Sequence, residues 1–258
     1  MLINSVIIIL REVLEAALII SVLLALSQKF QLPRSWVITA LLIGLVGAYV
    51  YATNIESVSM ALEGVGQEMT NASLHLLIYS FIVLLVITLK NAPHSRLILL
   101  SMTSCVAMAT IREGSEIIIY ISGFMSMPEL FMPVIIGAIV GTGIGVSIGV
   151  FFYYLIANMA FNKGVMLGLF LLILIAGGMI LQATQLLIQA DYIVSQQPLW
   201  DSSSLINERS LIGQLLYALI GYEATPSPIQ VICYFTSVTV ITFMTVITLR
   251  NSRHRESL

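Results

Sequence analysis

Two copies of one five-residue pattern, Arg-Glu-x-x-Glu, lie in long apolar stretches of the chain. The copies occupy residues 11–15 (REVLE) and 112–116 (REGSE). An ionised side chain at the centre of a bilayer costs about 2.5–3.5 kcal/mol on insertion scales. Because each copy places three such groups among apolar neighbours, we expect these charged residues to carry the function of the protein.

The spacing within each copy suits metal binding. The two glutamates stand three residues apart, which puts them on one face of a helix and about one turn apart, so that they could hold one ion together. The arginine stands four residues before the second glutamate, close enough to pair with it and hold that carboxylate in place. The candidate metal ligands are Glu12, Glu15, Glu113 and Glu116, supported by Arg11 and Arg112.

The charge of these six residues indicates the kind of ion. Four carboxylates and two guanidinium groups sum to −2, and oxygen ligands suit a hard cation rather than a soft metal that prefers Cys or Met. An alternative is that each Arg–Glu pair only holds helices together. Two observations speak against that alternative: the pattern is duplicated, and each copy has one glutamate more than its arginine can neutralise.

The composition shows which elements must position the motifs. Of 258 residues, 59% are apolar and 9% are charged, with a mean hydropathy of +1.01, which excludes an ordinary soluble domain. A span needs about 20 mainly apolar residues to cross the hydrocarbon core. The sequence therefore predicts an all-α polytopic membrane protein with seven transmembrane helices, at residues 3–27, 35–54, 70–90, 97–125, 131–158, 165–190 and 229–250.

The loops between these spans alternate in charge. Loops rich in Lys and Arg stay in the cytoplasm, and the basic residues follow the first, third, fifth and seventh spans. They are Lys29, Arg34, Lys90, Arg96, Lys163, Arg250, Arg253 and Arg255. The other loops are acidic and contain one basic residue, Arg209. We therefore predict a protein of the cytoplasmic (inner) membrane, with its N-terminus outside and its C-terminus in the cytoplasm.

The motifs also define an internal repeat. The copies are 101 residues apart, and each lies in the first of three consecutive spans. Because each repeat has three spans, an odd number, the two repeats cross the membrane in opposite directions. Such an inverted repeat is typical of transporters that bind substrate near the midplane. We predict one permease domain over 1–258: repeat one at about 1–95, repeat two at about 96–192, an outer loop at about 193–228 and an extra seventh helix at about 229–250.

The paired motifs, the seven-span plan and residues 210–227 (SLIGQLLYALIGYEATPS) resemble the oxidase-dependent iron permease family, the high-affinity ferric iron permeases of the bacterial EfeU type. The resemblance spans nearly the whole chain. It implies that the four motif glutamates bind Fe(III) as the transported substrate, and that an extracytoplasmic ferroxidase or iron-binding partner delivers it. The usual family motif has Gly and Leu between the glutamates; here Val13-Leu14 and Gly114-Ser115 stand there.

Three further acidic residues are candidates for an outer entry region. The loop between the second and third spans is similar to the acidic entry region of the family, with Glu63 and Glu68 as its carboxylates. Asp201, in the long loop before the last span, is a third candidate. The alternative is that these residues are simply solvated. A loop of nearly forty residues is too long for a simple connection, so we expect it to cover the outer entrance.

Other features favour structural roles. Gly137, Gly141, Gly145 and Gly149 recur every four residues, a stripe that lets helices approach closely. Cys105 and Cys233 have no close partner in the sequence and are interpreted as packing residues. His75 is the one histidine within a predicted span, so two histidines cannot hold a haem there, and no prosthetic group is expected.

The sequence thus favours an iron permease that imports Fe(III). Two alternatives stay open: a permease for another cation such as Fe(II), Mn(II) or Pb(II), and a membrane enzyme that uses the glutamates as acid and base. No nucleophile stands beside a base in the sequence, so an enzyme is not expected. Membrane lipid is the expected environment, nucleic acid is not an expected partner, and a homo-oligomer is compatible with the sequence.

Overall fold

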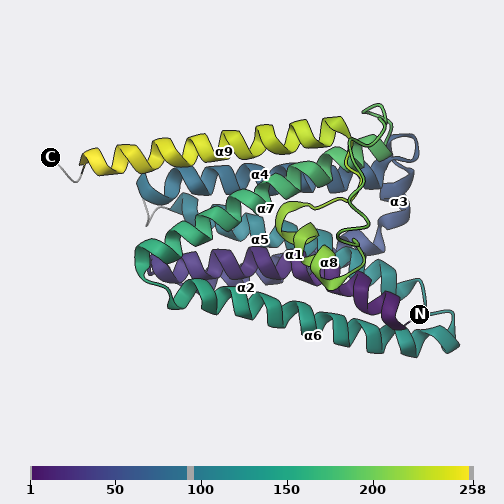
Figure 1. Cartoon of the computed structure of the whole chain (residues 1–258). Coiled ribbons are helices and arrows are strands. Elements are labelled where there is room, and N and C mark those ends of the chain that lie inside the picture. Colours follow the sequence, from purple (N-terminus) through teal and green to yellow (C-terminus); the bar gives the residue numbers. More distant parts are fainter. Residues whose placement is uncertain (1, 92–95, 256–258) are drawn as a thin grey trace.

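The computed structural model describes residues 2–91 and 96–255, which form helices and no strand (Figure 1). The long helices are α1 (Leu2–Lys29), α2 (Ser35–Thr53), α4 (Gly66–Asn91), α5 (Arg96–Ser122), α6 (Pro128–Asn158), α7 (Phe161–Gln189) and α9 (Pro228–Arg255). Three short elements lie in the connections: α3 (Ile55–Met60), the 3-10 turn η1 (Leu62–Gly64) and α8 (Leu211–Ile220).

Six of the long helices, α2, α4, α5, α6, α7 and α9, are long and apolar enough to cross a membrane. Helix α1 has 28 residues, but Arg11, Glu12 and Glu15 interrupt its apolar sequence. The multi-pass membrane architecture is therefore confirmed, whereas the count of seven spans and the repeat stay predictions.

The outer surface of the bundle is apolar where lipid would contact it. Large side chains such as Leu42 on α2, Ile139 on α6 and Phe243 on α9 are 60%, 67% and 63% exposed. Exposed apolar surface on this scale is unfavourable in water but matches the acyl chains of a bilayer.

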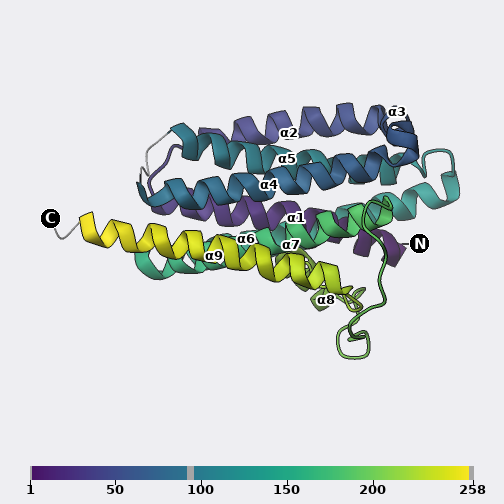
Figure 2. The ribbon, with the colours of Figure 1, turned by 90° about the horizontal axis from the view of Figure 1, so that it is seen from above.

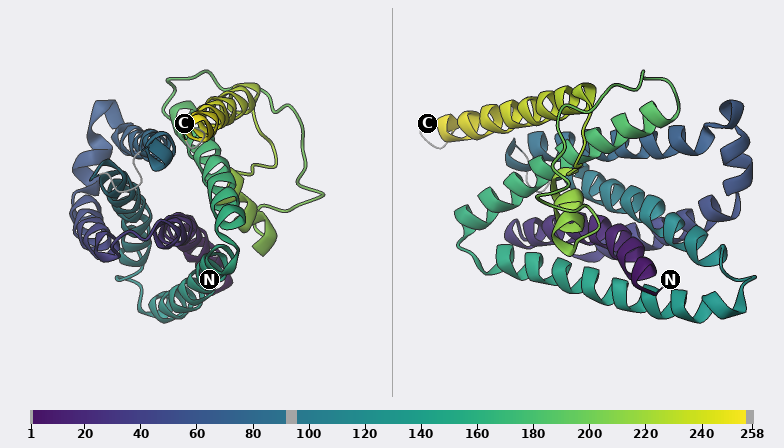
Figure 3. Two further views of the ribbon diagram at one scale, coloured as in Figure 1. Left: turned by 90° about the vertical axis from the view of Figure 1, so that its left-hand side faces the viewer. Right: turned by 45° about the vertical axis from the view of Figure 1, so that its right-hand side comes forward.

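Helix α1 lies in the middle of the bundle, with α5, α6 and α7 around it (Figure 3, left). It packs along α6 over the glycine stripe. A Cβ atom added at Gly141 would lie 2.7 Å from the carbonyl oxygen of Val6, and one added at Gly149 would lie 2.9 Å from the Cβ of Ala17. Because such distances are too short for a side chain, the stripe is confirmed as a packing surface.

Helix α5, which carries the second motif, also packs closely against a glycine-bearing helix, α2. Added Cβ atoms at Gly44 and Gly47 of α2 would lie 2.5 Å from Thr110 and 2.6 Å from Ile111 of α5. Each motif therefore lies on a helix that is held at close range by a glycine-bearing partner.

The two ends of the bundle differ (Figures 1 and 2). One end, here called the N-terminal face, carries the N-terminus, α3, η1, the α5–α6 connection and residues 190–227. The opposite end, the C-terminal face, carries the α1–α2 and α6–α7 connections and the C-terminal end of α9. Between the motifs and the C-terminal face the interior is filled by buried apolar side chains, among them Leu18, Val22, Leu85, Leu89 and Met102.

Residues 190–227, which include most of the outer loop predicted at about 193–228, contain the helix α8. The hydroxyl of Ser210 caps its start by accepting a hydrogen bond from the Gly213 amide at 3.0 Å. Gly221 ends the helix with a φ of +65°, a left-handed conformation that glycine adopts readily. Helix α8 packs against α1 and α7, which brings this segment beside the motif of α1.

Candidate metal centre

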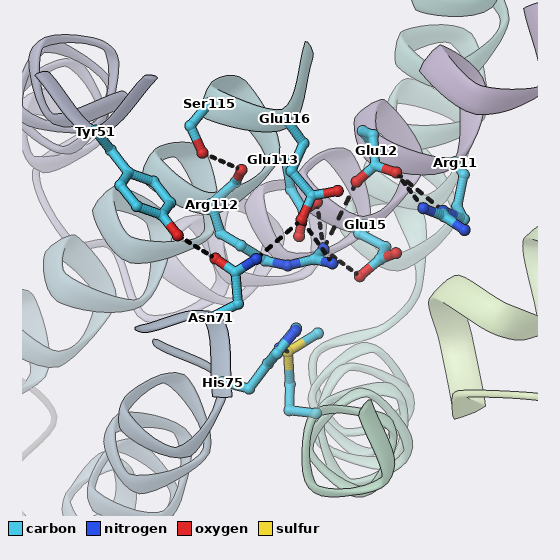
Figure 4. Close-up of polar contacts among 11 residues, drawn as sticks. Arg11, Glu12, Glu15, Tyr51, Asn71, His75, Arg112, Glu113, Ser115 and Glu116 are labelled. Carbon is cyan, nitrogen blue, oxygen red and sulfur yellow. Dashed lines mark hydrogen bonds and ion pairs between the residues drawn. The ribbon is translucent and has the colours of Figure 1, made fainter. Parts of the chain in front are cut away.

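The two motifs meet where α1 packs against α5 (Figure 4). Glu12 and Glu15 come from α1, and Glu113 comes from α5. Their side chains are 2%, 0% and 3% exposed, and one oxygen of each lies within 4.8 Å of the others. These three residues, here called the carboxylate triad, therefore converge in the interior from two helices that are far apart in the sequence.

Arg112 reaches into the triad from α5. Its Nη1 atom donates hydrogen bonds to Oε2 of Glu113 at 2.5 Å and to Oε2 of Glu15 at 3.3 Å. The same nitrogen lies 3.6 Å from Oε2 of Glu12, and Nη2 lies 3.3 Å from Oε1 of Glu116. One guanidinium thus contacts all four motif glutamates, including the predicted partner Glu116.

Arg11 pairs differently from the prediction. We expected it to hold Glu15, but its Nε and Nη2 atoms bind Oε1 of Glu12 at 2.9 and 2.7 Å. The prediction is wrong because Arg112 already holds Glu15 from the facing helix. Arg11 instead extends to the edge of the site, where its side chain is 37% exposed and its guanidinium carbon lies 5.5 Å from the ring centre of Tyr217.

A cavity of about 480 Å³ leads from the N-terminal face to this centre. Arg11, Glu12, Arg112 and Glu116 line it, together with polar residues of α4 and α7. Glu116 is the most accessible of the four glutamates, with a side chain that is 25% exposed. The cavity therefore reaches the triad at Glu12, the one triad member among its lining residues, from one end of the bundle, while buried apolar side chains fill the other end.

The three outer candidates lie in different surroundings. Glu68, at the start of α4, lines the cavity, and its Oε2 atom is buried without a hydrogen-bond partner among the described residues. Glu63 is exposed in η1, and Asp201 is exposed in the 190–227 segment. Neither lines the cavity. The Ser203 side chain and the Ser203 amide, which donates to Asp201 at 2.9 Å, hold the pKa of this carboxyl below its usual value.

Two polar residues of the cavity, Asn71 and His75, were not predicted as site residues from the sequence. Asn71 donates from Nδ2 to Oε1 of Glu116 at 3.3 Å and accepts from the Tyr51 hydroxyl at 3.0 Å. His75 is fully buried, with Nδ1 3.0 Å from Sδ of Met179. A polar side chain within an apolar span was the signal that could have identified Asn71 and His75 as site residues.

Helix α7 contributes a row of amides to the same cavity: Gln182, Gln185 and Gln189. Their spacing of three and four residues places them on one face, a pattern that is visible in the sequence but was not predicted as part of a site. Gln182 is 4% exposed and lies beside Glu15, yet neither atom of its amide makes a well-oriented hydrogen bond to a described residue. An amide buried in this way has donor and acceptor capacity for a ligand.

A smaller cavity of about 220 Å³ adjoins the first and shares Arg11, Gln182 and Tyr217 with it. Two carboxylates of the 190–227 segment, Glu208 and Glu223, line it. Glu208 accepts a hydrogen bond from the Ala224 amide at 2.5 Å, and Glu223 accepts one from Gln230. Burial raises the pKa of Glu223. This segment therefore folds over the side of the site, next to Arg11.

The centre as a whole is rich in oxygen and negatively charged. The four glutamates and two arginines sum to −2, as their sequence indicates, and no cysteine or methionine sulfur belongs to the triad. Hard cations of high charge prefer carboxylate and carbonyl oxygens. The residues that could hold such a cation are the triad, Glu116 and the amide of Gln182.

The chain was compared with known proteins. The model described as the iron permease FTR1 family matches residues 2–252, which is nearly the whole chain. No curated protein and no solved structure matches it.

Proposed function

We propose that this chain, which belongs to the iron permease FTR1 family, imports iron as Fe(III) through the carboxylate triad. The observation that carries this proposal is the convergence of Glu12, Glu15 and Glu113, which are buried with one oxygen of each within 4.8 Å of the others, next to a cavity that Glu12 lines. Three carboxylates offer three negative charges and oxygen ligands, which suit a small trivalent cation.

The ligand set would include a neutral oxygen. Gln182 lies beside Glu15 and has an amide without a well-oriented hydrogen bond to a described residue. Burying such a group without a ligand is costly. We infer that its carbonyl oxygen joins the triad in holding the ion, and that Glu116, at the cavity wall, receives the ion first.

The membrane arrangement is part of the proposal. Helix α1, at 28 residues and about 1.5 Å per residue, is longer than the hydrocarbon core and would be the seventh span. The packing supports an inverted repeat, because α1 packs on α6 as α5 packs on α2, while α4 packs on α7. The predicted orientation puts the acidic N-terminal face outside, where cations would enter the cavity.

Delivery of Fe(III) would need a second protein, because this ion is scarcely soluble at neutral pH. An extracytoplasmic ferroxidase or iron-binding protein would hand the ion over at the N-terminal face. Glu68 would act there as an entry ligand, because it lines the cavity with one buried oxygen free of hydrogen bonds to the described residues. Glu63 and Asp201, which do not line it, would act earlier, at the surface.

Uptake of iron by cells tests the proposal. We expect Glu12→Gln, Glu15→Gln and Glu113→Gln each to lower Fe(III) uptake by about tenfold or more at unchanged abundance in the membrane. The matched control is Glu129→Gln, which removes an exposed carboxylate at the start of α6, away from the cavity. Undiminished uptake in all three triad variants would show that the triad is structural.

The same cells distinguish Fe(III) from other cations. Fe(II), Mn(II) and Pb(II) are offered alone and in competition with Fe(III), under conditions that keep each oxidation state. A trivalent substrate predicts that none of the divalent ions inhibits at equal concentration. If a divalent ion is taken up preferentially and this uptake is lost in the triad variants, the proposed site is correct but its substrate is the divalent ion.

A further inference from the structure

The geometry of Arg112 conflicts with simultaneous binding of an ion. A hard cation binds carboxylate oxygens at about 2.0–2.6 Å, so an ion held by the whole triad must lie between its oxygens. Nη1 of Arg112 takes that place, at 2.5, 3.3 and 3.6 Å from Oε2 of Glu113, Glu15 and Glu12. The ion and this nitrogen exclude each other by size and by charge.

We propose that Arg112 is a tethered counter-cation that competes with the transported ion for the triad. This inference rests on the proposed function and adds a mechanism to it. The guanidinium leaves the triad when the ion enters and returns to expel the ion. Arg112 is thus a positioning and specificity-determining residue rather than a permanent support of one glutamate.

Competition with a tethered charge favours ions of high charge. With all three carboxyls ionised the triad carries −3, and Arg112 reduces this to −2. A monovalent ion that replaces the guanidinium leaves the net charge at the triad at −2, whereas a trivalent ion brings it to zero. Because the triad is buried, these differences are screened far less than at the surface. Arg112 therefore sets a threshold that excludes abundant monovalent cations.

The displaced guanidinium has a place to go. Arg112 lines the cavity of about 480 Å³, as do Glu116 and Glu68. Nη2 already pairs with Glu116 at 3.3 Å, and Oε2 of Glu68 is buried without a hydrogen-bond partner among the described residues. A turn of the Arg112 side chain toward these two carboxylates keeps its charge paired while it opens the triad.

Arg11 provides the matched comparison. It belongs to the same pattern and also contacts Glu12, but on Oε1, and its side chain lies at the cavity edge beside Tyr217. It does not stand between the triad oxygens. Removal of Arg11 should therefore leave the competition unchanged.

Metal binding to purified protein in lipid nanodiscs tests the inference. Ga(III) supplied as citrate serves as a trivalent probe without redox chemistry, and bound metal is measured by equilibrium dialysis. We expect Arg112→Gln to bind Ga(III) about tenfold more tightly than wild type while transporting iron more slowly. Arg11→Gln should bind within about threefold of wild type, and Arg112→Lys, which keeps the charge, should not bind more tightly than wild type.

Free guanidinium ions give a second test. In Arg112→Ala, millimolar guanidinium chloride should weaken Ga(III) binding competitively, because the free ion takes the place of the deleted side chain. The same concentrations should leave wild type unaffected. Arg112→Gln that binds Ga(III) no more tightly than wild type, or Arg112→Ala that is insensitive to guanidinium, would overturn the inference.

Glu15→Gln separates this inference from the proposed function. If Glu15→Gln binds Ga(III) as well as wild type does, the triad is not the site and the proposed function fails. If Glu15→Gln loses binding while Arg112→Gln also binds more weakly, the site stands and the competition is refuted. If Arg112→Gln does not reach the membrane, Arg112→Lys and the guanidinium test on Arg112→Ala decide.

Discussion

The two copies of the Arg-Glu-x-x-Glu pattern have the same charges in the same order but different surroundings. Arg112 has a side chain that is 7% exposed and contacts all four motif glutamates. Arg11 has one that is 37% exposed and pairs with Glu12 alone among them. The motif thus determines which charged groups are present, but the packing of the facing helix determines which of them form ion pairs.

The largest effect that this comparison predicts is on stability. Removing one partner from a buried ion-pair cluster leaves uncompensated charge and costs about 3–5 kcal/mol. Arg11 is partly exposed, and without it Glu12 still has Arg112 at 3.6 Å, so its removal should cost less. We therefore expect Arg112→Gln to lower the free energy of unfolding by about 3 kcal/mol and Arg11→Gln by less than about 1 kcal/mol. Thermal unfolding of both variants in the same detergent measures the difference, and equal losses would contradict it.

A smaller effect is expected from the helix packing that supports each motif. Gly141→Ala would push α6 away from α1, since the added Cβ would lie 2.7 Å from a backbone oxygen of Val6. Overpacking of this kind costs about 1–3 kcal/mol. Gly143 is the matched control, because a Cβ added there meets nothing within 4 Å. Gly143→Ala should be neutral or slightly stabilising, because alanine favours a helix over glycine. Similar unfolding temperatures for the two variants would show that the stripe is not tight.

The smallest effect concerns the contact that holds Arg11 at the cavity edge. A cation over an aromatic ring contributes about 0.5–1 kcal/mol at an exposed site. Tyr217→Ala removes the ring 5.5 Å from Arg11, and Tyr217→Phe keeps it. We expect the half-saturating iron concentration for uptake to rise about two- to fivefold in Tyr217→Ala and to stay near wild type in Tyr217→Phe. An equal rise in both variants would assign the effect to the hydroxyl rather than to the ring.

Much of the architecture could be predicted from the sequence because it depends on composition and period. The long apolar helices, the close packing at the glycine stripe and the family are confirmed. The pairing of Arg11 was predicted wrongly, because spacing along one helix cannot show that Arg112 from another helix already holds Glu15.

The polar residues of the cavity were missed for a related reason. Asn71 and Gln182 are polar residues in mainly apolar helices, and only the packing of α4 and α7 brings them to the same cavity. Helix α8 was missed although its signals are local: Ser210 caps its start and Gly221 its end. Length alone had suggested a loop over residues 193–228.

The glycine packing has a consequence for how the ion could be released. Because α1 meshes with α6 and α5 with α2, each pair would move as one rigid body. Glu12 and Glu15 belong to the first body, and Glu113 and Glu116 belong to the second. The four glutamates proposed to bind the ion are thus divided between two rigid bodies, so a small sliding motion between the two helix pairs would separate them together rather than one at a time.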